Sequence, residues 1–403
     1  MPSQLKIIHI TASYKPAYIY GGPIQSVSKL CETFSDDRIL TVNNGDAIIH
    51  DLEVFTTTAN GTKELDVKIG KQVLVEGVPV TYFNRWTKDH SHFSPGLLWG
   101  LRKTLRQTQD DKIIIHIHAW WNLVSVLSCL IAKWYKIPVM LSPRGMLTSY
   151  TLGNRNSLSK KLIHKIMGKN LLKYCHVHAT SEKEQKDILK IVVPKSIRVI
   201  PNMVSIPMEE VDSKYQKLNS EYQEINYFKL IFLSRIEEKK GLELLFNALA
   251  LEDISWQLTI AGSGEEVYIQ SLKLLANELK ISNNIYWVGQ ISNQNKYTML
   301  AAHDLLLLTS YNENFANVVV ESLRVGTPVL ISEHVGLADY VKDNELGWVT
   351  SLETAAIRNN IISAYQNTEK RQNIRNTAPL SIGRDFNDDT LVKQYLEFYK
   401  TII

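Results

Sequence analysis

The sequence has few cysteines and no segment typical of secretion. Its 403 residues include only three cysteines, Cys31, Cys129 and Cys175, which lie far apart. They match neither a disulfide framework nor the spacing of zinc ligands, so we expect a reducing cytoplasm. The first residues, MPSQLKIIHIT, lack the basic start and long apolar run of a signal peptide. We expect them to form a first β-strand.

Long uncharged hydrophobic runs are also scarce. Residues 113–132 carry no Lys, Arg, Asp or Glu over about the length of a membrane-spanning helix. His116, His118 and Asn122 interrupt this run, and its first part is rich in β-branched residues. The pattern favours a buried strand ending near His118, followed by a helix, over a membrane span.

Acidic residues are missing from one long stretch. None occurs between Asp111 and Glu182, where ten Lys and Arg residues lie, although the net charge of the whole chain is only +4. Such a local excess of positive charge indicates an anionic partner, which could be a nucleic acid, a phosphosugar or an acidic lipid.

The elements that are present alternate between strands and helices. A chain of this length exceeds one ordinary core, so we expect two α/β domains, at 1–203 and 204–385, and an amphipathic helix in 386–403. The polar stretch 213–226 reads as a linker or an extra helix. Short apolar runs predict mostly parallel strands at 5–11, 52–58, 113–118, 137–142, 176–181, 227–235, 256–262, 284–289, 304–310 and 327–332. Helices are expected at 241–250, 265–279 and 316–325 between strands of the second domain.

Two motifs of the second domain suit a phosphate group. In SRIEEKKG (234–241), Arg235 follows a strand and Lys240 precedes a glycine and a helix, and this pair of cations suits a diphosphate. The alternative is a solvated turn paired with neighbouring glutamates. In AGSG (261–264), Gly262 would let backbone amides approach an anion, although a tight turn explains it equally well. The third glycine of a dinucleotide fingerprint is absent, which argues against NAD.

A third motif, ENFANVVVE, holds two carboxylates on either side of an expected helix start. Glu313 and Glu321 would be roughly 12 Å apart along a helix, which is similar to the reach of a nucleotide sugar. Glu313 would accept hydrogen bonds from sugar hydroxyls, and Glu321 would accept them from a ribose diol. The backbone around Asn314, Phe315, Ala316 and Asn317 would hold phosphate at the helix N-terminus. The alternative is a helix-initiating acid and a surface acid.

The first domain contributes two further candidates. Gly21 and Gly22 lie in the loop after the first strand, where they could border a phosphate or an acceptor or serve as an ordinary connector. His118 lies at a strand end and is a candidate catalytic residue. His116 lies deeper in the sheet and is expected to be a satisfied core histidine.

In this order, the motifs resemble the family 4 retaining glycosyltransferases over nearly the whole chain. That family has the GT-B fold, an α/β architecture of two facing Rossmann-like doubly wound domains with a central cleft. The resemblance implies an N-terminal acceptor-binding domain and a C-terminal domain that binds a UDP- or GDP-linked sugar. The C-terminal helix would pack back on the first domain. Arg235 and Lys240 would stabilise the leaving diphosphate. Glu313 would orient the donor sugar and His118 would face it. No metal or other cofactor is implied.

Departures from the family pattern are found at Met203 and Arg144. VIPNM has Met203 where glycine is frequent, and SPRGML has Arg144 where many members carry histidine. This variant looks like a subset found in bacterial surface-polysaccharide assembly (capsule, O-antigen or exopolysaccharide). Arg144 could meet an acceptor phosphate, or it could be a plain surface arginine.

The basic stretch between Asp111 and Glu182 contains a candidate membrane-binding helix. Residues 157–173 predict a basic amphipathic helix suited to an anionic membrane surface, or a core-packed helix with a solvated basic face. The first reading places the protein on the inner face of the cytoplasmic membrane, with a polyprenyl-diphosphate-linked saccharide as acceptor. A nucleotide-sugar epimerase and an inactive nucleotide-sugar-binding subunit remain alternatives. Nucleic acid is not expected, because no recognition motif is present.

Overall fold

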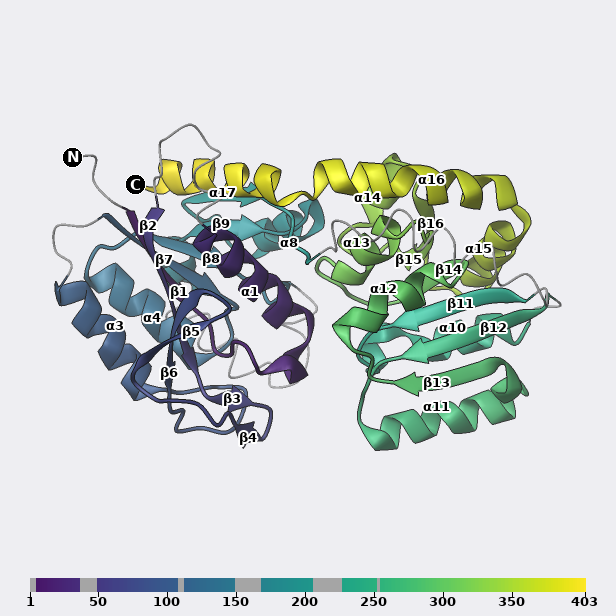
Figure 1. Cartoon of the computed structure of the whole chain (residues 1–403), viewed down its shortest axis with the longest axis horizontal. Helices are drawn as coiled ribbons and strands as arrows, with labels where there is room; N and C mark the ends of the chain where they lie inside the picture. The colour runs from purple at the N-terminus through teal and green to yellow at the C-terminus, as the bar shows by residue number, and fades with distance from the viewer. Residues whose placement is uncertain (1–4, 37–48, 108–111, 149–167, 206–226, 252–253) are drawn as a thin grey trace. The chain divides into compact units, whose positions relative to one another are not determined.

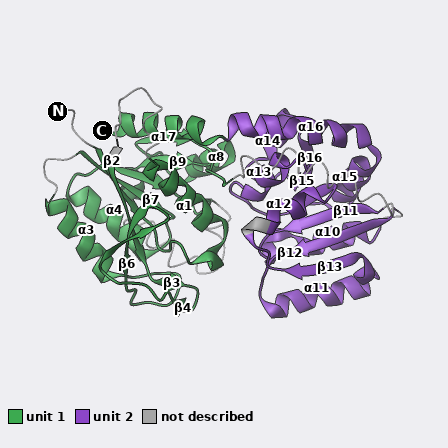
Figure 2. Cartoon of the chain, in the orientation of Figure 1, with its two compact units in different colours: residues 1–205, 387–403 green, residues 206–386 purple. Residues whose placement is uncertain are grey.

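The computed structural model describes residues 5–36, 49–107, 112–148, 168–205, 227–251 and 254–403. The chain divides into two compact units, coloured separately in Figure 2. Unit 1 comprises Met1–Ser205 with Asn387–Ile403, and unit 2 comprises Ile206–Phe386. The divisions expected from the sequence lay after residues 203 and 385. The polar stretch 213–226 and most of the expected helix at 157–173 lie outside the described residues.

Unit 1 is built on an eight-stranded sheet in the order β10-β9-β8-β7-β1-β2-β6-β5 (Figure 1). Every pair is parallel except β5 and β6, which form an antiparallel hairpin. The strands are β1 (Leu5–Ile10), β2 (Ile49–Thr57), β5 (Gln72–Val75), β6 (Val78–Phe83), β7 (Lys112–His118), β8 (Val139–Ser142), β9 (His176–Ala179) and β10 (Ser196–Val199). A separate two-stranded ribbon joins β3 (Ala59–Asn60) to β4 (Lys63–Glu64).

Helices cover both faces of this sheet. One core layer contains α3 (Pro95–Gln107), α4 (Leu123–Trp134), α7 (Lys169–Leu172) and α8 (Glu182–Ile191). The other contains α1 (Gly22–Ser35) and the C-terminal helix α17 (Asp388–Ile402), and a short η1 (Tyr18–Tyr20) precedes α1. Polar caps set the helix starts: the side chain of Asn122 accepts from the Ser125 amide at the start of α4. The sheet is therefore buried on both faces, which explains why its strands read as continuous apolar runs.

The amphipathic C-terminal helix packs on unit 1. Tyr395 and Tyr399 of α17 are buried and pack edge-on against Phe34 of α1. The side chain of Asn387 caps the helix by accepting from the Thr390 amide. The chain therefore returns to its first unit after completing the second.

Unit 2 is a parallel six-stranded sheet in the order β13-β12-β11-β14-β15-β16. The strands are β11 (Phe228–Leu233), β12 (Trp256–Ala261), β13 (Ile285–Gly289), β14 (Leu305–Leu308), β15 (Val329–Ser332) and β16 (Gly347–Thr350). The helical segments are η3 (Glu238–Lys240), α10 (Leu242–Leu249), α11 (Glu266–Glu278), η4 (Ser282–Asn284), α12 (Asn293–Ala301), α13 (Asn317–Arg324), α14 (Ala338–Asp343), α15 (Thr354–Gln366) and α16 (Thr368–Asp385). The strand order reverses between β11 and β14, and ligands of open α/β sheets bind at such a switch point.

All three cysteines are buried and free of disulfides. No helix in the described part of the chain combines the length and hydropathy that a bilayer-crossing segment requires.

Candidate functional site

The loops at the switch point of unit 2 bring Lys240 and Glu313 together. Lys240 ends η3, after β11, and Glu313 lies in the loop after β14. The Lys240 Nζ forms an ion pair with Glu313 Oε1 across 73 residues of sequence. Only 7% of the lysine side chain and 16% of the glutamate side chain are exposed. This buried pair is the centre of the candidate site in unit 2.

Backbone contacts explain why the two side chains meet. Gly241 has a φ of 65°, and a Cβ there would lie 2.3 Å from the carbonyl oxygen of Thr309. The Tyr311 amide donates to Lys239 O at 2.8 Å, which ties the two loops together. The Glu313 amide donates to His334 O at 3.1 Å, so the next loop along the sheet holds the glutamate. A glycine at 241 therefore lets the loop that carries Lys240 approach β14 closely.

Glu313 is held in its charged form. Burial alone would raise its pKa, but the positive charges of Lys240, Lys239 and Arg235 act against burial and lower the pKa below its ordinary value. A carboxylate that is charged and only partly covered can accept hydrogen bonds from hydroxyl groups.

Arg235 lies in the loop after β11, close enough for its charge to act on Glu313, and Gly262 lies in the adjoining loop after β12. The Arg235 side chain is 44% exposed and forms an ion pair of 2.6 Å with Glu237. This is the solvated-turn arrangement that the sequence left open, although the guanidinium remains accessible. At Gly262, with a φ of 150°, a Cβ would lie 1.8 Å from the carbonyl oxygen of Ser234. The close approach of the loops after β11 and β12 therefore explains why residue 262 is a glycine. This agrees with the tight turn that the sequence offered as an alternative.

The helix start expected in ENFANVVVE lies where the spacing places it. Helix α13 begins at Asn317, and its N-cap residue, Ala316, has a left-handed φ of 69°. No acidic residue lies in the first turn, so the positive end of the helix dipole is not neutralised there by its own side chains. Asn314 lies before the helix, and Phe315 is buried with its ring edge-on to Phe386.

Glu321 is not the surface acid of the alternative reading. It is buried within α13, and Lys296 of α12 donates to its Oε1 at 2.7 Å. The lysine side chain is 11% exposed and the glutamate side chain 6%. A hydrogen-bonding partner for a buried acid was expected here, but the sequence did not identify Lys296 as that partner. Its only signal in the sequence is a basic residue on the helix preceding β14.

In unit 1, Gly21 lies in the segment after β1 and His118 is the last residue of the neighbouring strand β7. Gly21 has a φ of 66° and precedes α1, whose first residue is Gly22 and which has no side-chain cap. His118 ends β7, which pairs with β1. The strand order places the switch point of this sheet between β1 and β7, so these residues lie at the edge where a ligand is expected.

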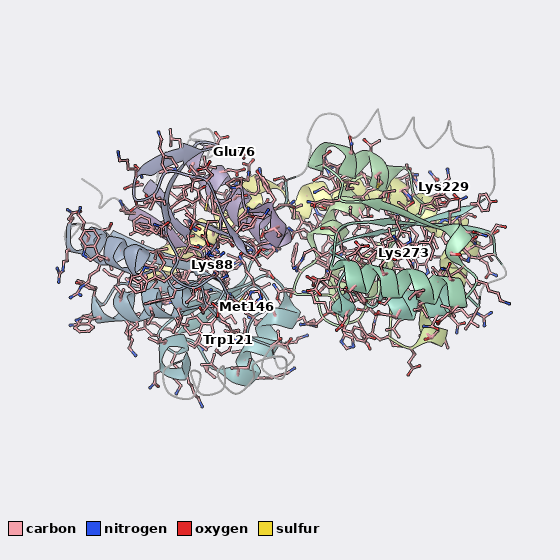
Figure 3. All side chains as sticks on the ribbon, turned by 90° about the horizontal axis from the view of Figure 1, so that it is seen from below. Glu76, Lys88, Trp121, Met146, Lys229 and Lys273 are labelled. Carbon is pink, nitrogen blue, oxygen red and sulfur yellow. The ribbon has the colours of Figure 1, made fainter. Side chains whose placement is uncertain are left out.

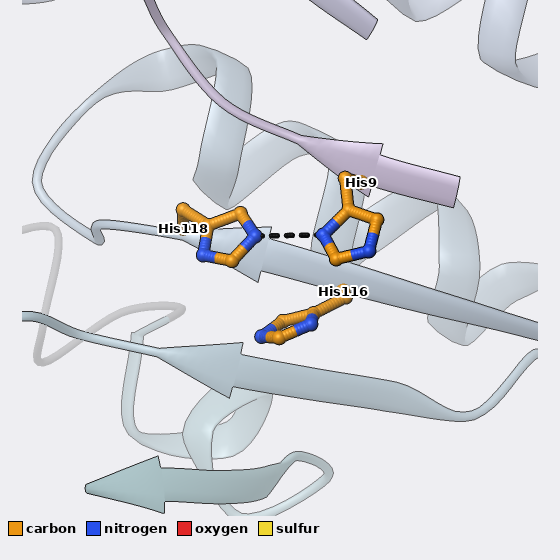
Figure 4. A group of neighbouring side chains, drawn as sticks. All are labelled: His9, His116 and His118. Carbon is orange, nitrogen blue, oxygen red and sulfur yellow. Dashed lines mark hydrogen bonds between the residues drawn. The ribbon is translucent and has the colours of Figure 1, made fainter. Parts of the chain in front are cut away.

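The His118 ring is buried and bonded on both nitrogens. Its Nε2 lies 2.9 Å from His9 Nδ1, and the rings stack with 4° between their planes (Figure 4). Arg144 points its guanidinium at His118 Nδ1, with Nε at 3.4 Å. Because arginine can only donate, His118 Nδ1 is the acceptor and Nε2 carries the hydrogen, which it donates to His9. Burial lowers the pKa of His118 well below its ordinary value, and the nearby Arg144 cation acts in the same direction.

Arg144 is not the plain surface arginine of the alternative reading. Its guanidinium also donates to Ser26 Oγ of α1 at 2.8 Å and to Asn202 Oδ1 at 3.0 Å. The turn that carries it is tied to the start of α4, because Trp121 Nε1 donates to the Met146 carbonyl at 2.6 Å (Figure 3). Arg144 thus connects two other segments of unit 1, at Ser26 and Asn202, to His118.

A buried carboxylate braces the same turn. Glu184 accepts from the Gly145 amide at 2.7 Å and from the Thr180 amide at 2.7 Å. Its charge raises the pKa of Arg144, against the larger lowering effect of burial. Glu184 and His9 were not among the site residues expected from the sequence, although Ser181 and Glu184 have capping-box spacing.

His116 is the satisfied core histidine that the sequence predicted. Its Nδ1 lies 2.7 Å from the Tyr399 hydroxyl, and its Nε2 lies 2.7 Å from Ser142 Oγ. Within the described residues, His9, His116 and His118 alone bring three potential metal-ligand atoms close together, within 4.8 Å of one another. Their nitrogens already serve hydrogen bonds, apart from His9 Nε2, and the Arg144 cation adjoins them. This environment disfavours a divalent cation.

Two family models match the chain, one over each unit. Residues 217–380 match the model of glycosyl transferases group 1, and residues 48–206 match that of glycosyltransferase family 4. An uncharacterized glycosyltransferase of Methanocaldococcus jannaschii is 23% identical over 331 residues, which are 77% of this chain and 82% of that protein. An uncharacterized 41.2 kDa protein in the cps region of Klebsiella pneumoniae is 22% identical over 334 residues, which are 80% of this chain and 87% of that protein.

Solved structures share the fold. HepE of Anabaena in complex with UDP and glucose has a TM-score of 0.71 at 19% identity, over 98% of this chain and 99% of that one. The apo form of WaaB, a lipopolysaccharide outer core galactosyltransferase, has a TM-score of 0.66 at 18% identity, over 98% of this chain and 100% of that one. These likenesses extend over both units of the chain.

Proposed function

Because the chain belongs to the glycosyltransferase family that these two models describe, with the GT-B fold, we propose that it moves a hexose-type sugar from a UDP- or GDP-linked donor to a saccharide acceptor. Transfer retains the configuration at the anomeric carbon. HepE has been crystallised with UDP and with UDP-glucose, which supports a nucleotide-sugar donor. The relative from a cps region and LpsE, a lipopolysaccharide core enzyme of Rhizobium meliloti, support a role in bacterial surface polysaccharide synthesis.

The buried Lys240–Glu313 pair at the switch point of unit 2 is the observation that carries this proposal. A diphosphate offers Lys240 an anionic partner in place of Glu313, and Arg235 lies beside it with an accessible guanidinium. The released carboxylate then accepts hydrogen bonds from sugar hydroxyls. Glu321 accepts from the ribose diol with its second oxygen, while Lys296 holds the first.

The reaction breaks the bond between the anomeric carbon and the phosphate oxygen and forms one from that carbon to an acceptor oxygen. Negative charge develops on the departing nucleoside diphosphate. Lys240, Arg235 and the N-terminal end of α13, around Ala316 and Asn317, stabilise this charge. The departing phosphate oxygen takes the proton of the acceptor hydroxyl. The cations of the chain supply the positive charge that this step needs, so we expect no metal requirement.

Unit 1 binds the acceptor in this proposal. Gly21 and Gly22 form an uncapped helix start that suits a phosphate. His118 reaches a donor sugar only if its ring leaves His9 and Arg144. The Arg144 charge has no ion-pair partner among the described residues, which favours an acceptor with a phosphate, such as a polyprenyl-diphosphate-linked saccharide. Such an acceptor would bring the protein to the cytoplasmic face of the membrane.

A panel of UDP- and GDP-sugars tests the donor. Thermal shift identifies the nucleotide sugar that stabilises the protein, and nucleotide release with acceptor measures turnover. Lys240→Ala and Glu313→Ala should each lower turnover by about 100-fold or more. Lys342→Ala, which removes an exposed lysine of unit 2, serves as the control. Near wild-type turnover in either site variant, or stabilisation by no nucleotide sugar, would contradict the proposal.

A further inference from the structure

The turn that carries Arg144 has an uncommon backbone. It follows β8 and spans residues 143–146, closed by a hydrogen bond of 3.2 Å from the Met146 amide to the Pro143 carbonyl. Its two central residues, Arg144 and Gly145, have φ values of 52° and 77°. Positive φ at both central positions is the pattern of a type I′ turn, which glycine adopts freely and arginine adopts only with strain. A strained residue of this kind persists where surrounding contacts hold it.

The carboxylate of Glu184 holds this turn to the end of β9. Its Oε1 accepts from the Gly145 amide at 2.7 Å, and its Oε2 accepts from the Thr180 amide at 2.7 Å and from the Thr180 hydroxyl at 2.9 Å. Thr180 directly follows β9, and Glu184 lies in the first turn of α8 and is 2% exposed. Both oxygens therefore act as acceptors. A glutamine at this position would present an NH₂ group to one of the donors.

The guanidinium of Arg144 reaches from the turn to helix α1. Its Nη1 donates to Ser26 Oγ at 2.8 Å and to Asn202 Oδ1 at 3.0 Å. Ser26 is four residues beyond Gly22, so it lies about 6 Å along the helix from its first residue. That end of α1 has no side-chain cap and no acidic residue in its first turn. The turn at 143–146 therefore directs a cation toward the positive end of a helix.

Glu184 has two opposite effects on an anion bound by Arg144. Its negative charge lies close enough to favour the charged form of the guanidinium and raise its pKa, and the same charge would repel an anion. Its hydrogen bonds to the turn instead fix the place from which the guanidinium donates. Removing the carboxylate would tighten anion binding if the charge dominated, and would weaken it if the placement dominated.

We propose that Glu184 is a positioning residue for Arg144: by holding the turn at 143–146, it places the guanidinium where it receives the phosphate of the acceptor. This inference rests on the proposed function, which assigns that phosphate to Arg144. It accounts for a strained arginine that stays in place and for an acid buried beside it. Glu184 itself does not contact the phosphate, because like charges repel.

Calorimetric titration with farnesyl diphosphate, a short prenyl diphosphate, tests the binding of the phosphate. Farnesol, which lacks the phosphates, should bind much more weakly. Arg144→Gln should weaken the binding of farnesyl diphosphate by about tenfold or more, as expected for a lost charged hydrogen bond. The same loss should appear in a Lys240→Ala background, because Lys240 belongs to unit 2. If the loss appeared with glucose 1-phosphate instead, a soluble phosphosugar would be the source of the phosphate and the role of Glu184 would stand.

A double-mutant cycle separates positioning from a general structural role. Glu184→Gln should weaken binding by about fivefold or more in the wild-type protein and by less than about twofold in Arg144→Gln, because it acts through the arginine. Gly145→Ala, which strains the turn without changing Glu184, should give the same pattern and replaces Glu184→Gln if that variant does not fold. Glu182→Gln, the same substitution at an exposed position of the first turn of α8, is the matched control and should leave binding unchanged. Thermal unfolding verifies that each variant is folded.

Three results would overturn the inference. Unchanged or tighter binding in Glu184→Gln would show that the carboxylate does not place the guanidinium. Equal losses from Glu184→Gln with and without Arg144 would assign Glu184 a general structural role. Binding of both phosphate probes that Arg144→Gln does not weaken would remove the phosphate from Arg144. This last result would leave sugar transfer itself standing, because the measurements with UDP- and GDP-sugars test the donor separately.

Discussion

At the scale of single residues, the candidate site depends on charged side chains that are buried in pairs. A buried charge is costly unless a partner compensates it, so removing one member leaves the other charge unpaired. Lys240 with Glu313 and Lys296 with Glu321 are two such pairs, and both sit at the ends of strands or on the helices beside them. Each pair can therefore be tested by removing its members singly and together.

The Lys240–Glu313 pair should show strong coupling. We expect Lys240→Met to lower the free energy of unfolding by about 3–5 kcal/mol, because Glu313 is left buried without its cation. Combining Lys240→Met with Glu313→Gln should recover much of this loss while turnover stays absent. Urea unfolding of the two single variants and the double variant measures the coupling. Additive losses would show that the pair does not hold the loops together.

Lys296 should matter for binding the donor more than for the chemical step. We propose that it positions Glu321 for the ribose, so Lys296→Met should raise the KM for the donor by about tenfold or more, in line with about 1.5–3 kcal/mol for a charged hydrogen bond, with little change in kcat. A donor that lacks the ribose 2′-hydroxyl should bind equally weakly to the wild-type protein and to the Lys296→Met variant. Lys342→Met serves as the control. If Lys296→Met weakened binding of the donors with and without the 2′-hydroxyl by the same factor, Lys296 would have a purely structural role.

At the scale of elements, the strands and helices around the site were predictable because their signals are local. The apolar runs at 227–235 and 304–310 correspond to β11 and β14, and the helix start in ENFANVVVE corresponds to Asn317 at the start of α13. The hairpin of β5 and β6 was missed, because its strands are short and mixed in polarity and turn at Glu76 and Gly77. Strand β16 was also missed.

Pairings between distant elements were the part that the sequence did not reveal. Lys296 meets Glu321 from a separate helix, and Arg144 meets Ser26 and Asn202 from two other segments. No local pattern encodes such contacts, because the packing of helices on the sheet decides them. Burial likewise changed the reading of His118, whose position at a strand end was correct but whose ring faces His9.

The glycines at strand ends can be tested by comparing two of them. Gly262 and Gly289 both have positive φ, but a Cβ at Gly262 would meet Ser234 O at 1.8 Å, whereas nothing lies within 4 Å at Gly289. Gly289→Ala should cost about 1–2 kcal/mol from backbone strain. Gly262→Ala should cost at least about 2 kcal/mol more, because the loops after β11 and β12 must separate. Equal losses in urea unfolding would show that close packing does not explain Gly262.

At the scale of the whole molecule, buried histidines make unit 1 sensitive to acid. Burial lowers the pKa of His9 and of His178 to about 3, with a further lowering effect from Arg144. His116 and His118 have pKa values well below the ordinary range for the same reason. The unfolded chain takes up these protons near pH ~6.5, but the native unit does not. Stability should therefore fall as the pH falls below about 6.5.

The expected slope is about 1.4 kcal/mol per pH unit for each proton taken up on unfolding. Urea unfolding between pH ~7.5 and ~5, followed by circular dichroism, measures it. His9→Gln with His178→Gln should reduce the slope. A stability that stays constant over this range would contradict burial of the histidines in their neutral form.

The position of a bound donor tests the central claim most directly. The chain should be crystallised with the nucleotide sugar that gives the largest thermal shift. We expect the diphosphate to lie against Lys240, Arg235 and the start of α13, with sugar hydroxyls on Glu313 and the ribose on Glu321. A donor bound elsewhere, with the Lys240–Glu313 ion pair intact, would contradict the account.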